Sequence, residues 1–179
     1  MSLNHIDGTE NWFDRHVKAE AEEDIFSYSD RLGNIVALGV IILVTFYFAA
    51  HQMWSTGFFT SEFGSTEMFL FYSSLLYELV LTGIKGFIGR KNFARFFEIF
   101  GSILSTIALI WLYTIFPFDF TYFADVLPGF LRFLVQWVSS DLARVVMILG
   151  IIVMPITALY NAVLYIFVRK ELCSETENS

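Results

Sequence analysis

The chain has 179 residues, of which 56% are hydrophobic, and its net charge is −7. Soluble domains average about 45–50% apolar residues, and a soluble surface with this excess would aggregate, so the composition indicates a membrane protein. Residues 1–33 hold eight acidic side chains against three basic ones, which argues against binding nucleic acid and against electrostatic docking on anionic lipid. The single cysteine, Cys173, excludes an intramolecular disulfide and a multi-cysteine metal site, and no cofactor is expected.

Residues 1–33 are predicted to form a cytoplasmic, acidic, amphipathic segment. Apolar residues recur at helical spacing along it, at Phe13, Val17, Ala21, Ile25 and Tyr28. Two interpretations stay open for this predicted helix. Its apolar stripe packs on the membrane bundle, or its acidic face docks a basic cytoplasmic partner.

Four stretches are apolar and long enough to cross a hydrocarbon core about 30 Å thick. They cover residues 34–52, 67–88, 96–116 and 142–168. The sequence therefore predicts an all-α, polytopic membrane protein with a four-helix transmembrane domain over 34–168. Residues 169–179 form a polar cytoplasmic tail, which is predicted to be disordered from Ser174 onward.

The basic residues set the predicted orientation, because Lys and Arg favour cytoplasmic connections. Nine of the eleven fall on one side of the membrane: Arg15, Lys18, Arg31, Lys85, Arg90, Lys91, Arg95, Arg169 and Lys170. Only Arg132 and Arg144 fall on the other side. Both termini are therefore predicted to be cytoplasmic. His51, beside Gln52, is interpreted as part of a polar cluster at the outer interface.

The connections between the spans differ in character. The second is only a few residues long, so spans two and three should form a tight antiparallel hairpin. The third, residues 117–140, is apolar but is broken by Asp119, Asp125 and Pro128. Apolar residues at helical spacing within it predict a short helix in the outer interface, anchored by Trp137. A re-entrant segment is the alternative.

Glu78 lies near the middle of the second span, where an ionisable side chain costs about 2.5–3.5 kcal/mol on insertion scales. Such a position is by default a candidate functional site. Three roles stay open for its carboxyl group. It is hydrogen-bonded and holds helices together, it exchanges protons or cations along a transport route, or it has a substrate-binding or catalytic role.

Several polar residues are predicted to lie near Glu78. Ser74 and Thr82 share its helix face, and Lys85 follows one heptad later. On the fourth span, Asn161 falls at a depth where a hydrogen bond to Glu78 is feasible. The predicted ion or proton pathway therefore comprises Glu78, Ser74, Thr82, Lys85, Asn161 and Glu98.

Glu98 begins the third span near the cytoplasmic surface, where Lys85 or Arg95 could pair with it. Farther along that span, Gly101 and Ser105 have the small-xxx-small spacing that allows close helix approach. Pro155 interrupts the fourth span, as a tolerated kink or as a hinge.

Enzymatic activity is not expected, because the chain lacks the motifs of nucleophilic and metal-dependent hydrolases. The leading hypothesis is an integral membrane protein, acting as an oligomer or subunit, that moves protons or small cations with Glu78 as the exchange site. The alternative is a non-transporting accessory or scaffold protein that acts by binding a partner. The expected partners are the lipid bilayer and either further copies of the chain or another membrane protein.

Overall fold

The computed structural model describes residues 12–22 and 24–177, and the helices dominate it. The α-helices are α1 (Trp12–Glu22), α2 (Tyr28–Met53), α3 (Ser65–Phe87), α4 (Lys91–Ile115) and α5 (Ser140–Glu177), with two 3₁₀ helices, η1 (Phe120–Tyr122) and η2 (Gly129–Leu134). Within the described residues, α2, α3, α4 and α5 are long and apolar enough to span a membrane. The predicted all-α bundle of four candidate membrane spans is confirmed.

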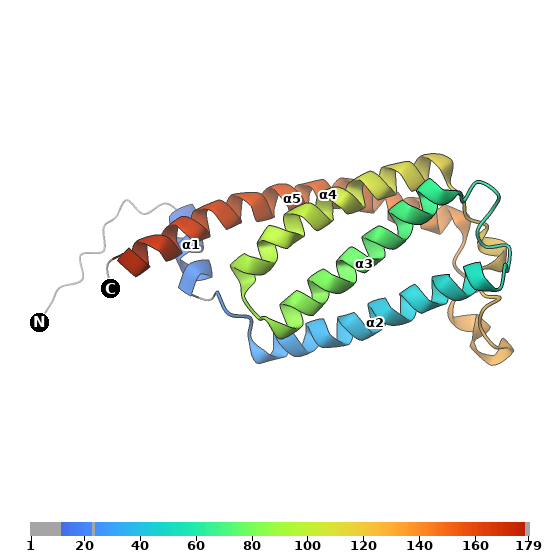
Figure 1. Cartoon of the computed structure of the whole chain (residues 1–179), viewed down its shortest axis with the longest axis horizontal. Coiled ribbons are helices and arrows are strands. Elements are labelled where there is room, and N and C mark those ends of the chain that lie inside the picture. The colour runs from blue at the N-terminus through green and yellow to red at the C-terminus, as the bar shows by residue number, and fades with distance from the viewer. Residues whose placement is uncertain (1–11, 23, 178–179) are drawn as a thin grey trace, which may run out of the picture.

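The four long helices pack in chain order. Helix α2 packs on α3, α3 on α4 and α4 on α5, while the short α1 packs on α5 (Figure 1). Helix α1, the α3–α4 turn at residues 88–90 and the C-terminal part of α5 lie at one end of the molecule, here called the terminal end. Residues 54–64 and 116–139 lie at the opposite end, here called the loop end. Helix α1 and the C-terminal part of α5 therefore share one side of the bundle.

Small residues set the close packing of α3, α4 and α5. A Cβ atom built on Gly101 of α4 would lie 2.6 Å from Cε1 of Tyr77 on α3. A Cβ on Gly150 of α5 would lie 2.7 Å from Cδ1 of Leu109 on α4. A larger side chain at either position would require the Tyr77 ring or the Leu109 side chain to shift. The close approach predicted at Gly101 is present.

The N-terminal stripe divides into a packed part and an exposed part. Val17 and Ala21 are buried against Val168 of α5, so these two pack on the bundle as one interpretation predicted. Ile25 and Tyr28, however, are 71% and 83% exposed. The prediction that they continue the same packed stripe is wrong, because α1 ends at Glu22 and the chain turns before α2 begins.

The connection between α1 and α2 pairs with the turn between α3 and α4. The backbone N–H of Phe26 donates to the carbonyl of Gly89, and that of Lys91 donates to the carbonyl of Asp24. The Ser27 hydroxyl then accepts from the N–H of Asp30 and caps α2. This cap explains why α2 begins at Tyr28, before the predicted start of the first span at residue 34.

Two further boundaries differ from the predictions. The predicted interfacial helix between the third and fourth spans consists of η1 and η2, with Phe130 and Leu134 of η2 exposed. At the other end of the chain, α5 continues past residue 168 to Glu177. The prediction of a disordered tail from Ser174 is therefore wrong for residues 174–177.

An aromatic cluster fills the loop end. Phe58, Phe118 and Leu112 are buried at its centre. Partly buried residues packed around them are Phe48, Phe59, Phe63, Phe71, Phe116, Phe120, Phe123 and Met147. Because these side chains come from α2, α3, α4, α5 and both connections, the cluster joins all four spans at this end.

Candidate functional site

A groove of about 420 Å³ opens between α3 and α5, with α4 as its floor. Its lining residues are Phe71, Ser74, Leu75 and Glu78 of α3, Ser105, Ala108, Leu109 and Leu112 of α4, Phe118, and Met147 and Met154 of α5. Only the Ser74, Glu78 and Ser105 side chains in this set are polar. The groove is therefore mostly apolar, with a single carboxylate along its wall.

Glu78 lies close to the middle of its span. Nine residues separate it from Phe87 at the end of α3, which corresponds to about 13 Å along the helix axis. Its side chain is exposed. Among residues 12–22 and 24–177, no hydrogen bond or ion pair joins the Glu78 carboxylate to another group. The hydrogen bond considered between Asn161 and Glu78 is not formed.

The other residues of the predicted pathway do not all lie along the groove. Ser74 lines the groove with Glu78, and its hydroxyl donates to the carbonyl of Phe71 at 2.8 Å in its own helix. Thr82 and Asn161 are buried and are not among the residues that line the groove. The structure thus brings Ser74 and Glu78 to one surface, and leaves Thr82 and Asn161 inside the packed helices.

Lys85 and Glu98 form an ion pair that joins α3 to α4 near the terminal end. Both side chains are about one-fifth exposed. Arg95, the other partner considered for Glu98, pairs instead with Glu20 of α1. The two pairs connect three helices at this end, and neither reaches the groove that Glu78 lines.

Pro155 lies within a continuous α5. It lines a second apolar pocket, of about 390 Å³, between α4 and α5. Since proline has no N–H, the carbonyl of Ile151 lacks its usual helical donor. Helix α5 therefore lacks one backbone hydrogen bond at this position, and a locally weakened helix is what the hinge hypothesis requires.

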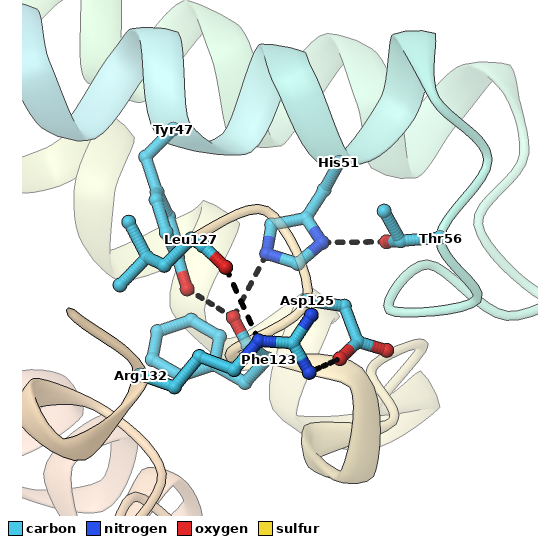
Figure 2. Close-up of polar contacts among 7 residues, drawn as sticks. All are labelled: Tyr47, His51, Thr56, Phe123, Asp125, Leu127 and Arg132. Carbon is cyan, nitrogen blue, oxygen red and sulfur yellow. Dashed lines mark hydrogen bonds and ion pairs between the residues drawn. The ribbon is translucent and has the colours of Figure 1, made fainter. Parts of the chain in front are cut away.

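A polar site that was not predicted from the sequence lies at the loop end (Figure 2). His51, only 1% exposed, places its Nε2 3.0 Å from the carbonyl oxygen of Phe123 and its Nδ1 2.6 Å from the Thr56 hydroxyl oxygen. The Tyr47 hydroxyl donates to the same Phe123 carbonyl. Because a carbonyl only accepts, Nε2 of His51 must carry a proton. The other ring nitrogen, Nδ1, shares a hydrogen bond with the Thr56 hydroxyl.

Nearby contacts hold the segment that carries Phe123 in place. Arg132 donates from Nε to the carbonyl of Leu127 at 3.1 Å, and its Nη1 lies 3.1 Å from a carboxylate oxygen of Asp125 (Figure 2). Helix α2 thereby binds a segment more than 70 residues later in the chain. The sequence predicted His51 to lie at the outer interface. The one sequence signal for its contact with the later segment was its position at the end of an apolar span.

A second missed polar site lies at the start of α3. Glu67 is buried, and its carboxylate accepts from Nε1 of Trp111 at 2.8 Å and from the N–H of Gly64 at 3.0 Å. The second contact caps α3, since Glu67 lies three residues after the N-cap Gly64. Glu67 and Glu78 thus share a helix but differ in environment: the Glu67 carboxylate accepts two hydrogen bonds, whereas that of Glu78 has no partner within the part of the chain that the structure describes.

The described residues contain no group of three His, Cys, Asp or Glu side chains placed to hold a metal ion. The chemical capacity of the groove rests on one carboxylate and two hydroxyls. That capacity covers proton exchange, hydrogen bonding and weak binding of a single cation. No protein-family model, curated protein or solved structure matches this chain.

Proposed function

We propose that the protein is one subunit of a homo-oligomeric membrane assembly that moves protons or small cations, with Glu78 as the exchange site. The observation that supports this proposal is the environment of Glu78. Its carboxyl group lies near mid-span on an exposed groove wall and has no partner among the described residues. Ionisable groups at that depth almost always face a bundle interior or a water-filled cavity.

Assembly supplies the missing interior. In an isolated subunit, lipid tails would contact the groove and the Glu78 carboxyl group. A second copy packed over α3 and α5 would enclose Glu78, Ser74 and Ser105 in a shared cavity. Closed homo-oligomers are the most common kind of assembly, so a second copy is the occupant that we propose.

The exchange chemistry needs only the groups along the groove. Carboxyl groups within membrane spans form the proton relays of pumps and transporters, and the carboxyl group of Glu78 would act as such a relay here. The Ser74 and Ser105 hydroxyls are donors and acceptors on the two sides of the groove. Thr82, Asn161 and the Lys85–Glu98 pair lie on the terminal side of Glu78 and would continue the route there. The proposed activity is non-enzymatic, and the terminal end is proposed to face the cytoplasm.

The alternative is a non-transporting accessory or scaffold protein. The contacts of α1 weigh against the version that uses this helix for docking, since Val17 and Ala21 are buried on α5 and Glu20 pairs with Arg95. A scaffold protein that associates through the groove would assemble but would not transport protons or cations. The two functions therefore make the same prediction for oligomerisation and opposite predictions for transport.

Filling the groove tests the assembly. Ser105→Trp places a large side chain in the groove, whereas Ile110→Trp places the same side chain on an exposed position of α4 outside it. Subunits are counted by single-molecule photobleaching in lipid nanodiscs. We expect oligomers for the wild type and Ile110→Trp, and a shift to monomers for Ser105→Trp. Monomers in all three proteins would contradict the proposed assembly, and binding of a different membrane protein would identify another occupant.

A further inference from the structure

A pocket of about 370 Å³, with a mostly apolar lining and a few polar and charged side chains, opens at the terminal end, apart from the groove that holds Glu78. It forms where the α1–α2 connection, the start of α4 and the C-terminal part of α5 meet (Figure 1). Asp24, Arg90 and Asn92 contribute its polar wall, with Tyr165 and Arg169 from α5. The pocket lies at the start of one candidate membrane span and in the C-terminal part of another, and lipid headgroups lie beside the ends of such spans.

Two arginines give the pocket a positive balance. Within residues 12–22 and 24–177, the Arg90 guanidinium has neither a hydrogen bond nor an ion pair. Arg169 donates from Nη1 to the Tyr165 hydroxyl at 3.0 Å, and this leaves most of its donors available. Two guanidinium groups against one carboxylate, Asp24, leave a formal charge of +1 among the lining residues. Although residues 1–33 carry an excess of acidic side chains, the residues that line this pocket therefore have a positive net charge.

The single carboxylate in the pocket, that of Asp24, already makes a structural hydrogen bond. Asp24 accepts the backbone N–H of Asn92 at 2.8 Å and so caps the first turn of α4. Asp24 thus occupies two N–H groups at the start of α4, that of Asn92 through its carboxylate and that of Lys91 through its carbonyl oxygen, and the helix N-terminus is not proposed as the anion-binding element. An anion would be held by the guanidinium groups of Arg90 and Arg169, whose planar donors match phosphate oxygens.

Asn92 supplies an independent sign of a ligand. Its side chain is 7% exposed, it lines the pocket, and its Oδ1 atom is buried without a hydrogen-bond donor. A buried acceptor without a donor costs about 1–3 kcal/mol. A ligand that carries a hydroxyl group beside its phosphate would satisfy this atom. An alcohol hydroxyl is a donor whatever the charge state of the phosphate, whereas a P–OH group donates only in the protonated form.

The apolar part of the pocket faces the membrane. Phe93 and Phe96, in the first two turns of α4, line the pocket and are 44% and 39% exposed. They lie about 3–8 Å along the helix axis from the start of α4, toward the bilayer interior. This places an apolar surface directly beneath the arginines, as a molecule with a charged head and hydrocarbon tails requires.

We propose that this pocket binds the headgroup of an anionic glycerophospholipid that carries a free hydroxyl group. The phosphate lies between Arg90 and Arg169, the headgroup hydroxyl donates to Oδ1 of Asn92, and the acyl chains run along Phe93 and Phe96. Basic pockets between membrane helices bind such headgroups in general. The assignment is independent of the transport role proposed for Glu78.

Lipid competition tests the site. The full chain is reconstituted in phosphatidylcholine nanodiscs that contain equal minor amounts of phosphatidylglycerol and phosphatidic acid, and retained lipids are counted by native mass spectrometry after extraction. We expect the wild type to retain phosphatidylglycerol preferentially. Arg90→Gln with Arg169→Gln should lose about 25-fold in retention, at about fivefold per basic residue. The matched control, Arg132→Gln with Arg144→Gln at the loop end, should retain the lipid.

Asn92→Leu separates the hydroxyl contact from the phosphate contact. This variant keeps the backbone N–H that Asp24 accepts, so α4 remains capped. We expect it to bind phosphatidylglycerol and phosphatidic acid equally. Equal retention by the wild type and the double arginine variant would overturn the proposal. Displacement of the lipid by millimolar inorganic phosphate would also overturn it, because the ligand would then be a soluble phosphate.

Discussion

His51 joins α2 to the connection between the third and fourth spans, with its Nε2 3.0 Å from the carbonyl oxygen of Phe123. Tyr47, one helical turn earlier, donates to the same oxygen. The side chains of α2 thus hold a segment that contains only short 3₁₀ turns. The loop end depends on this shared acceptor as well as on its aromatic cluster.

Removing both donors should cost more than the sum of the single losses. Tyr47→Phe or His51→Leu alone leaves the Phe123 carbonyl with one donor, and each bond is worth about 0.5–1.5 kcal/mol. The double variant leaves this partly buried carbonyl without either side-chain donor, so we expect a coupling energy of about 0.5–3 kcal/mol. Equilibrium unfolding in detergent micelles measures it. Strict additivity would show that the shared carbonyl does not couple the two residues.

The buried carboxylate of Glu67 makes Trp111 sensitive to substitution. Trp111→Phe removes the indole donor and should lower the free energy of unfolding by about 1.5–3 kcal/mol, the usual range for a hydrogen bond to a charged group. Trp137→Phe is the matched control, because the Trp137 indole donates to a backbone carbonyl at an exposed position. Equal losses for the two variants would argue against a special role for the Glu67 contact.

Gly101 should not tolerate a side chain. A Cβ at this position would lie 2.6 Å from the Tyr77 ring, so Gly101→Ala should destabilise the protein by about 1–3 kcal/mol through overpacking. Gly39→Ala in α2 is the control, since its Cβ would have no atom within 4 Å. That control should be neutral or stabilising by up to about 1 kcal/mol. Thermal unfolding of both variants in one detergent provides the comparison.

The ion pair of Lys85 and Glu98 predicts rescue by charge exchange. Lys85→Glu alone places two carboxylates together across the α3–α4 interface and should be destabilising, and Glu98→Lys should be destabilising through two ammonium groups. The double exchange restores opposite charges and should recover most of the loss. A double variant that is less stable than both single variants would contradict a direct interaction.

The spans could be predicted because each depends on a continuous apolar run of its own residues. Contacts between distant segments could not be predicted in this way. His51 and Phe123 are 72 residues apart, and Glu67 and Trp111 are 44 apart, so no local periodicity relates them. The Lys85–Glu98 pair was predictable because the short hairpin connection brings the ends of α3 and α4 together.

For Glu78, the sequence indicated an unusual side chain at mid-span but could not show its surroundings. The position of Glu78 on an open groove depends on how α5 packs against α4 beside α3, and this follows from side-chain shapes such as Gly150 against Leu109. Asn161 was predicted near Glu78 from depth alone. Depth along the helices does not fix which faces meet, and Asn161 is buried away from the groove.

The most direct test of the central claim is dissipation of a pH gradient in proteoliposomes, with insertion matched among the proteins. Wild type is compared with Glu78→Gln, which keeps the shape of the side chain and removes its exchangeable charge. Glu62→Gln, at an exposed position of the loop end, controls for loss of a carboxylate. We predict flux in the wild type and Glu62→Gln and its loss in Glu78→Gln. Flux that persists in Glu78→Gln, or is absent from the wild type, would contradict the proposed role of Glu78.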